Sequence, residues 1–285
     1  MRGIVLAGGS GTRLWPATSV LSKQLLSVFD KPMIYYPLST LMLAGVREIL
    51  IITTPHDQVF FKNLLGDGSD FGLSLEYAIQ KNPAGLAEAL IIAEDFIGID
   101  STLMILGDNI FHGVGLGRQL QSSIPPKGAH IFAYEVSNPS DYGVLTLDEK
   151  KQPKLIEEKP KSPKSNLAIT GLYFFDNDAS KYAKQVKPST RGELEITSLI
   201  NTYLEKNQLT YTKLNRGVAW LDTGTPTSLQ DAATYIRIIE ERTGMKIACL
   251  EEIAFIQGWI KSTDIQEKIQ KYKNNSYAQY LSKLI

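Results

Sequence analysis

The chain has 285 residues, of which 30 are Lys or Arg and 30 are Asp or Glu, so its formal net charge at pH 7 is zero. This balance excludes the basic excess of a nucleic-acid or anionic-membrane surface, and any phosphate recognition must therefore be local. No apolar run approaches the roughly 20 residues needed to cross a bilayer, no secretory signal is visible, and the single cysteine, Cys249, excludes an intramolecular disulfide, so a cytoplasmic protein is expected.

The first predicted element is a short buried strand over residues 3–7, which ends in a glycine-rich loop. Gly8, Gly9 and Gly11 lack a Cβ atom, so the backbone can adopt positive φ and approach a ligand closely. Amide groups left free in such a loop suit phosphate oxygens. The loop is therefore a candidate phosphate-binding site.

Two basic residues strengthen this interpretation. Arg13 and Lys23 follow the loop, and a fork-shaped donor together with a mobile ammonium group suits a polyphosphate. The P-loop motif does not fit, because it requires Lys and then Ser or Thr directly after its last glycine, where Thr12 stands. The dinucleotide fingerprint requires Gly or Ala at Leu14, and Asp30, near the expected acidic position, lies in a turn. A tight turn without a ligand is the remaining alternative.

The rest of the chain alternates between strand-like and helix-like segments. In chain order we expect a helix over 34–44 capped by Gly45, a strand over 48–53, a helix over 56–65, a strand over 74–80, a helix over 86–95, strands over 102–106, 129–136 and 168–175, a helix capped near Thr197, a strand over 217–221, a helix over 229–241 and short helices over 251–284. Strand, helix and strand in this order predict an α/β fold with a parallel sheet, whose ligands bind at the carboxyl ends of the strands.

Two aspartates directly follow predicted strands. Asp108 comes after the strand over 102–106, and Asp222 comes after the strand over 217–221 at a glycine turn. Mg²⁺ binds through one or two carboxylates together with substrate phosphates, so we pair these two residues on one ion. From the residues alone, Asp108 can equally cap a turn, since Gly107-Asp108-Asn109 is also turn chemistry.

Four further polar residues have both a functional and an ordinary interpretation. The Gln80 amide can pair with the edge of a pyrimidine, Glu158 can accept sugar hydroxyls, and Lys159 suits a monophosphate. Taken as bare residues, Gln80 is more often a surface side chain and the Glu158–Lys159 pair is more often solvated. For Arg191 the ordinary interpretation is a charged loop.

Longer strings decide between these interpretations. Residues 6–16 read LAGGSGTRLWP, with Lys23 ten residues after Arg13, and this pattern resembles the sugar-nucleotidyltransferase family. The continuation through SKQLL at 22–26 and DKPMIYYPLSTLMLAG at 30–45 is similar to the branch that acts on dTTP and α-D-glucose 1-phosphate. The resemblance implies a Rossmann-like nucleotidyltransferase fold with a mainly parallel, mixed central sheet flanked by helices. It also implies Mg²⁺-dependent formation of dTDP-glucose and pyrophosphate, the first step of dTDP-L-rhamnose and deoxysugar synthesis.

The resemblance also assigns roles to residues that match the family's motifs. The implied catalytic residues are Arg13, Lys23, Asp108, Lys159 and Asp222, with Asp108 and Asp222 as metal ligands. The implied nucleotide-binding residues are Leu6, Gly8, Gly9, Gly11, Thr12, Arg13, Gln24, Gln80, Pro83 and Gly85. The implied sugar-phosphate-binding residues are Asn109, Gly143, Glu158, Lys159, Tyr173 and Arg191.

The family pattern divides the chain into a catalytic domain over 1–225 and a helical C-terminal region over 226–285 for oligomerisation or regulation. Within the catalytic domain, residues 1–110 form the nucleotide-binding part and residues 111–225 form the sugar-phosphate-binding part. It implies a homotetramer with a second, inhibitory nucleotide site near Leu43, His112, Gly113, Arg216, Glu252 and Ile253. His112 replaces a common Tyr, and Ile256 replaces a common Arg, whose loss should weaken pyrophosphate binding there.

Three other functions stay open from the sequence. The same chemistry can use UTP or another sugar 1-phosphate, because the thymine methyl group contributes only about 1–3 kcal/mol of discrimination. A non-catalytic sugar-nucleotide-binding regulatory protein is less favoured, since the carboxylates and phosphate-binding lysines are all present. A dinucleotide-dependent oxidoreductase is less favoured still, because the fingerprint fails.

Overall fold

The computed structural model describes residues 1–9, 11–125, 127–273 and 275–285. Its central sheet contains the strands β1 (Arg2–Ala7), β4 (Glu48–Thr53), β5 (Ser74–Ile79), β6 (Thr102–Leu106), β8 (Ala129–Glu135), β9 (Gly143–Leu147), β10 (Pro153–Glu158), β11 (Leu167–Phe175) and β12 (Leu209–Lys213). Their order is β10-β9-β11-β6-β1-β4-β5, with β8 beside β11 and β12 beside β8. The expected mixed α/β fold is confirmed.

One half of the sheet is parallel, as the strand–helix–strand order predicts. β1 pairs in parallel with β4 and β6, and β4 with β5. Ile4 and Val5 point to opposite faces of β1 and both are fully buried, because helices cover both faces. Leu6 lies opposite Leu106 in the register. The segments that follow β1 and β6 therefore leave the sheet at the same edge.

The other half is antiparallel and is organised by β11. This strand pairs with β6, β8 and β9, all antiparallel, and its register on β8 shifts between Ile169 and Tyr173. Every residue of β11 is buried. The irregularity lies at Gly171, whose N–H turns away from the ladder and donates to the Asn109 side chain at 3.1 Å. The bulge therefore directs a backbone donor toward the end of β6.

A second, two-stranded sheet holds the predicted strand over 217–221. β7 (Asn109–Gly113) and β13 (Val218–Asp222) pair antiparallel, so that Asp222 lies opposite Asn109. This pairing lies outside the central sheet. It brings the segment after β6 and the end of β13 together although they are more than 100 residues apart in sequence.

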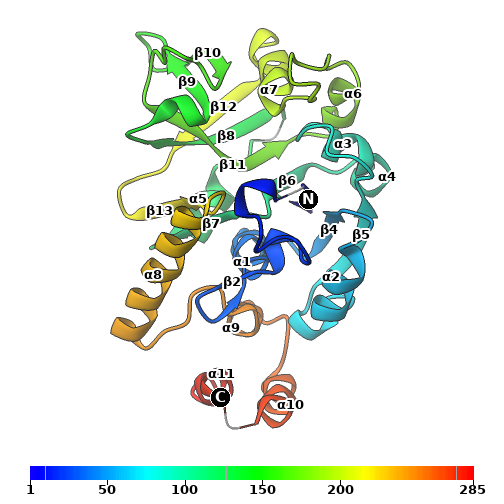
Figure 1. Ribbon diagram of the computed structural model, residues 1–285, viewed down its shortest axis with the longest axis vertical. Helices are drawn as coiled ribbons and strands as arrows, with labels where there is room; N and C mark the ends of the chain where they lie inside the picture. Colours follow the sequence, from blue (N-terminus) through cyan, green and yellow to red (C-terminus); the bar gives the residue numbers. More distant parts are fainter. Residues whose placement is uncertain (10, 126, 274) are drawn as a thin grey trace.

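Helices surround these sheets (Figure 1). They are α1 (Tyr35–Leu43), α2 (Gln58–Leu65), α3 (Glu88–Ile92), α4 (Glu94–Ile97), α5 (Leu116–Ser122), α6 (Ala179–Ala183), α7 (Ile196–Glu205), α8 (Pro226–Thr243), α9 (Leu250–Ile256), α10 (Ser262–Tyr272) and α11 (Ser276–Leu281). The helix expected over 86–95 is broken into α3 and α4 at Ala93. None of the helices in the described residues is both long and apolar enough to cross a membrane.

The ends of two helices differ from the sequence-based expectation. Thr197 does not cap α7, because the helix begins at Ile196 with Glu195 at the N-cap and without a side-chain cap bond. The Thr197 hydroxyl instead donates to Glu158 at 3.2 Å. At α8, Thr225 supplies a capping box with Ser228. The C-terminal helices α8 to α11 begin where a separate region was expected, and that domain division stays a prediction.

Candidate active site

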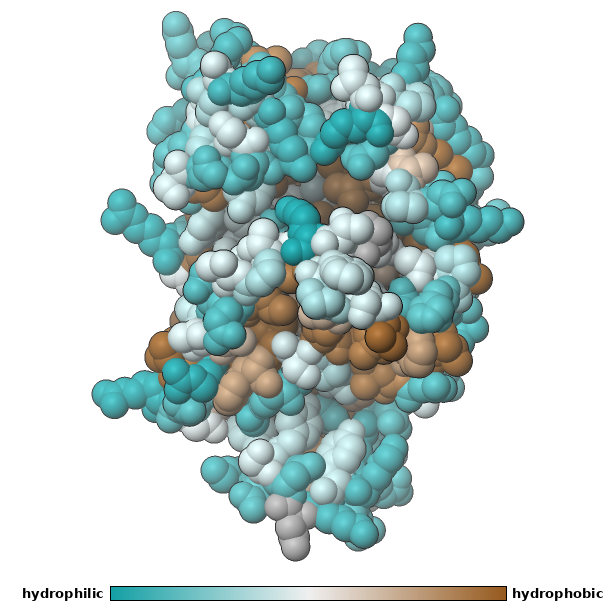
Figure 2. Space-filling model, in the orientation of Figure 1, coloured by the Kyte–Doolittle hydropathy of each residue, from teal (hydrophilic) through white to brown (hydrophobic). Residues whose placement is uncertain are grey.

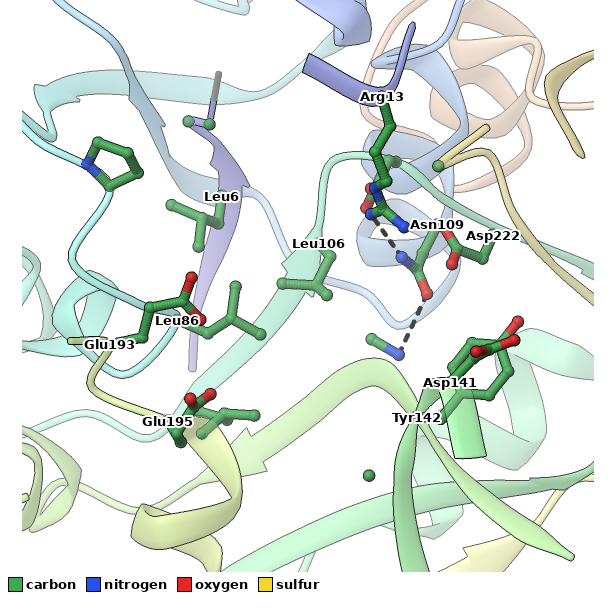
Figure 3. A pocket seen from close by; sticks show the side chains of 18 of the residues that line it. Leu6, Arg13, Leu86, Leu106, Asn109, Asp141, Tyr142, Glu193, Glu195 and Asp222 are labelled. Carbon is green, nitrogen blue, oxygen red and sulfur yellow. Dashed lines mark hydrogen bonds between the residues drawn. The ribbon is translucent and has the colours of Figure 1, made fainter. Parts of the chain in front are cut away.

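A cavity of about 600 Å³ opens at the carboxyl ends of β1 and β6. The space-filling view shows the molecule hollowed between the N-terminal loop and the part that carries β9, β10 and α7 (Figure 2). In the close view, Arg13 reaches from the N-terminal loop toward Asn109 and Asp222, while Glu193 and Glu195 lie on the opposite side (Figure 3). The position agrees with the rule that ligands of such sheets bind beyond the strand ends.

The N-terminal loop forms one wall of this cavity. Gly9 and Gly11 adopt φ values of 118° and 59°, the left-handed region that glycine accommodates without strain. Gly11 O accepts a hydrogen bond from the Thr18 hydroxyl at 2.8 Å, which holds the turn. Residue 10, in the middle of the predicted glycine loop, lies outside the described residues. The cavity-lining positions of Gly8, Gly9 and Gly11 leave their backbone open to a ligand.

Asp108 and Asn109 form the floor of the cavity and are held by a connected network. Asn109 Oδ1 accepts from Trp220 Nε1 at 2.6 Å and from Gly171 N at 3.1 Å, while Asn109 Nδ2 donates to Asp108 Oδ1 at 2.9 Å. The Lys23 ammonium forms an ion pair with the other Asp108 oxygen. Two donors from separate strands fix the Asn109 amide, and the amide in turn fixes the Asp108 carboxylate.

The two aspartates differ in electrostatic environment. Burial acts to raise the pKa of Asp108, but Lys23 and the Asn109 amide outweigh it and hold this pKa below its usual range. Burial and the neighbouring charge of Asp108 raise the pKa of Asp222, against the opposing effects of Lys23 and Arg13. A Cβ built on Gly224 would lie 3.1 Å from both Arg13 Nη2 and Asp222 Oδ1, so a larger residue here would crowd these two groups.

Asp108 and Asp222 fit a hard divalent cation. The two carboxylates repel each other in a largely buried site, and the nearby basic groups offset their negative charge only in part. Their oxygen atoms are therefore suitable ligands for a cation. Among the described residues there is no group of three or more His, Cys, Asp or Glu side chains suited to a metal. A site of two carboxylates is what Mg²⁺ uses when substrate phosphates and water complete its coordination.

Carboxylates surround Arg191 on the opposite wall. Glu195, which is 7% exposed, accepts from Arg191 Nε at 3.2 Å and from Arg191 Nη2 at 2.9 Å. Glu158 accepts from the same Nη2 at 3.2 Å. Burial, with the charge of Glu195, raises the pKa of Glu158 despite Lys159, Thr197 and Arg191. Lys159 is exposed at the cavity edge, and its backbone N–H donates to Tyr142 O at 3.0 Å.

Most of the residues predicted from the sequence line this one cavity. They are Leu6, Gly8, Gly9, Gly11, Thr12, Arg13, Lys23, Gln24, Pro83, Asp108, Asn109, Gly143, Glu158, Lys159, Tyr173, Arg191 and Asp222. The individual roles of these residues stay predictions.

Two predicted nucleotide-binding residues, Gln80 and Gly85, lie behind the cavity wall. Gln80 is only 4% exposed and borders Gly8, whereas Gly85 packs against the backbone of Leu194. The ordinary interpretation of Gln80 as a surface residue is therefore wrong.

Sequence reasoning missed several lining residues. The sequence pattern indicates only a strand at Trp220 and a segment before a helix at Glu195, yet both side chains hold other site residues in place. Tyr142 and Leu106 also line the cavity. The signal available for Leu106 is its position at the end of β6, whereas nothing local distinguishes Trp220 or Tyr142.

The residues expected at a second nucleotide site lie away from this cavity. Leu43 ends α1, His112 and Gly113 end β7, and Glu252 and Ile253 belong to α9. His112 Nδ1 lies 2.8 Å from the Tyr235 hydroxyl, and Glu252 accepts from the Tyr280 hydroxyl at 2.7 Å. Arg216 is exposed between β12 and β13, and the Ile256 side chain is exposed at the end of α9.

Comparisons with known proteins agree with the geometry. A family model described as "Nucleotidyl transferase" matches residues 2–237. A glucose-1-phosphate thymidylyltransferase from Neisseria meningitidis is 54% identical over 286 residues, covering 100% of this chain and 99% of that protein. The protein of the same name from Mycobacterium tuberculosis is 50% identical over 285 residues, with 100% and 99% covered.

Solved structures show the same fold. A Bacillus anthracis protein assigned as a glucose-1-phosphate thymidylyltransferase, crystallised with sucrose, has a TM-score of 0.76 and 41% identity over 83% of this chain and 95% of its own. A UDP-glucose pyrophosphorylase complexed with UDP-glucose has a TM-score of 0.75 at 22% identity, over 84% and 98%, which shows the fold alone. The chain therefore belongs to the nucleotidyl transferase family, and its glucose-1-phosphate thymidylyltransferase relatives match it over its full length.

Proposed function

We propose that this chain is a glucose-1-phosphate thymidylyltransferase, which joins dTTP and α-D-glucose 1-phosphate into dTDP-glucose and releases pyrophosphate. The observation that supports this most is a single cavity lined by the glycine loop with Arg13 and Lys23, by the Asp108–Asp222 pair and by the Lys159–Arg191 wall. Cationic groups on two opposite walls suit two phosphate esters that must meet. Full-length relatives at 50–54% identity carry the same name.

In this mechanism the phosphate oxygen of glucose 1-phosphate attacks the α-phosphorus of dTTP. The attacking oxygen is already an anion, so no general base is required. The difficulty is electrostatic repulsion between two polyanions, and catalysis therefore depends on in-line positioning and charge neutralisation. Arg13 and the free amides of the glycine loop bind the nucleotide phosphates, whereas Lys159 and Arg191 bind the sugar phosphate.

Asp108 and Asp222 are the residues that would hold Mg²⁺, which neutralises phosphate charge when bound. Lys23 pairs with Asp108 in the free protein, so its ammonium group already lies where phosphate charge will gather. Asn109 keeps Asp108 oriented through the bond between the two side chains. The protein thus holds the carboxylates in place before substrates arrive.

The test is pyrophosphate release with glucose 1-phosphate and each of dTTP, UTP, CTP and ATP. We expect dTTP to be used best and UTP to be used as well, because the two bases present the same pairing edge and differ by one methyl group. Release that is equal for all four nucleotides, or absent with every sugar phosphate, would contradict the proposal. A preference for UTP would favour the second candidate, a uridylyltransferase with the same chemistry.

We further infer a homotetramer whose second nucleotide site, near Leu43, His112, Arg216 and Glu252, gives weak product inhibition. The exposed Ile256 offers no charged group to a pyrophosphate at that surface. Sedimentation of the free protein and inhibition of turnover by added nucleotide sugar test the two parts separately. A monomer, or strong inhibition that does not depend on Arg216, would contradict them.

A further inference from the structure

Glu88 lies behind the nucleotide wall of the cavity and contacts the side chain that follows β5. Gln80 Nε2 donates to Glu88 Oε2 at 2.6 Å and makes a longer contact of 3.4 Å with Gly85 O. The same Glu88 oxygen accepts the Ala84 N–H at 3.3 Å. One half-buried carboxylate therefore holds both the Gln80 amide and the turn that leads to Pro83 and Leu86 at the cavity surface.

This contact determines which way the Gln80 amide faces. The two ends of an amide are similar in shape, so their assignment rests on the hydrogen-bond partners. As a carboxylate, Glu88 can only accept, and the atom that faces it must be the Nε2 donor. Oε1 must then face the other way.

The other direction leads to the glycine loop. A Cβ built on Gly8 would lie 2.6 Å from Gln80 Oε1, so Oε1 sits directly beside a residue that lines the cavity. Within the described part of the chain, both hydrogen bonds of the Gln80 side chain are made by Nε2. The carbonyl oxygen is thus left as an unused acceptor beside Gly8, a residue of the cavity wall.

We propose that Glu88 is a positioning residue for base selection, which holds Gln80 Oε1 as an acceptor and so favours bases that carry a hydrogen on the ring nitrogen of the pairing edge. This inference rests on the proposed function. Thymine and uracil carry an N3–H donor. Cytosine has an unprotonated N3, so two acceptors would face each other and one buried polar group would stay unpaired. Sites that depend on a hydrogen bond reject such analogues far better than apolar pockets do.

The isosteric variant Glu88→Gln tests this assignment. The new side chain can accept or donate, so the Gln80 amide is free to adopt both orientations. We expect the ratio of kcat/KM for dTTP to that for dCTP to fall by about tenfold, since one orientation now donates to cytosine N3. The ratio of dTTP to dUTP should stay unchanged, because both bases carry N3–H. The control is Glu76→Gln, at an exposed position on β5, which should leave both ratios unchanged.

An equal fall in kcat/KM for dTTP, dUTP and dCTP would show that Glu88 only supports the fold and would overturn the proposal, as would unchanged kinetics. Glu88→Ala removes the acceptor altogether and should also lower the ratio of kcat/KM for dTTP to that for dCTP. This variant replaces Glu88→Gln in the test if Glu88→Gln does not fold. If the unaltered protein releases no pyrophosphate, the proposed function fails. The ratio of Kd values for dTTP and dCTP, measured by calorimetry, then still decides the role of Glu88.

Discussion

Asn109 shows how single side chains organise this site. Its oxygen accepts from a tryptophan on β13 and from the bulged backbone of β11, and its nitrogen donates to Asp108. Two of the partners are donors and the third is a carboxylate acceptor, so the amide has one satisfied orientation. A neighbouring carboxylate that is fixed in this way needs little reorganisation when charge arrives, which is the condition for strong electrostatic catalysis.

At this scale, the metal assignment predicts the effect of removing either carboxylate. Asp108→Asn and Asp222→Asn should both keep the fold and lower kcat about 10²–10³-fold, because each removes one charged contact from the site. Pyrophosphate release at increasing Mg²⁺ measures the loss, and circular dichroism checks the fold. Activity that no longer depends on Mg²⁺, yet stays near the original rate, would exclude the residue as a metal ligand.

The contact between Glu195 and Arg191 leads to a second residue-scale prediction. Glu195 is buried and accepts from both Nε and Nη2 of Arg191, so it holds the guanidinium group in one position. Glu195→Gln should raise KM for glucose 1-phosphate about tenfold while KM for dTTP changes little, because one charged partner of Arg191 is lost. Glu205→Gln, an exposed position on α7, is the control. A larger effect on dTTP would place Arg191 on the other substrate.

At the scale of elements, β11 and β8 connect the two parts of the sheet. β11 pairs with β6 of the parallel half and with β9 of the antiparallel half, while β8 joins it to β12. On this outer pair, both ring nitrogens of His130 lie within hydrogen-bond distance of threonine hydroxyls of β12, Thr210 at 2.8 Å and Thr212 at 3.0 Å. The histidine is therefore a buried neutral link between two strands.

This link predicts a pH dependence of stability. Burial lowers the pKa of His130 to about 4, below its ordinary value of 6.5. Between these values the unfolded chain binds a proton that the folded chain does not. The stabilisation is therefore complete above pH 6.5 and is lost as pH falls toward 4. We expect His130 to lower the free energy of unfolding by roughly 3 kcal/mol over this pH range. Denaturant unfolding measures the free energy of unfolding across this pH range, and this free energy should depend less on pH in His130→Gln. An equal dependence on pH in both proteins would contradict the role of His130.

At the scale of the whole molecule, the N-terminal hairpin and the C-terminal helices are joined by a charge network centred on the buried pair Lys31 and Glu240. The hairpin of β2 (Ser27–Val28) and β3 (Lys31–Pro32) packs beside α8 (Figure 1). Lys31 donates to Glu240 at 2.9 Å, and Lys246 donates to the same carboxylate at 2.8 Å, while Asp30 pairs with both lysines. The hairpin follows the short segment that carries Lys23, so this network ties that segment of the cavity wall to the end of α8.

Breaking this network should destabilise the whole protein. Lys31→Met removes the buried partner of Glu240 and leaves Glu240 and Asp30 to share the half-buried Lys246 ammonium group. Removing one partner of a buried ion pair typically lowers the free energy of unfolding by about 3–5 kcal/mol. Lys213→Met, which breaks an exposed pair with Glu135, is the control and should change it by less than about 1 kcal/mol. Urea unfolding of both variants measures the difference. Equal effects would mean that the buried network does not hold the hairpin and α8 together.

The order of elements and the chemical character of the site could be predicted from the sequence alone. Strands such as β4 and β6 begin and end where their apolar runs do, because these patterns are local. Residues 8–13 and Lys23 predict a phosphate-binding loop, since glycine and cationic side chains restrict what can bind there.

Tertiary structure alone decided which side chains act through one another. The pairing of Asp222 with Asn109, the Trp220 bond across 111 residues and the orientation of Gln80 by Glu88 depend on the path of the chain between distant segments. No periodicity or turn signal in the sequence predicts such partners. Hydrogen bonds and ion pairs act only over a few ångströms, so residues far apart in sequence interact only after the fold has brought them together.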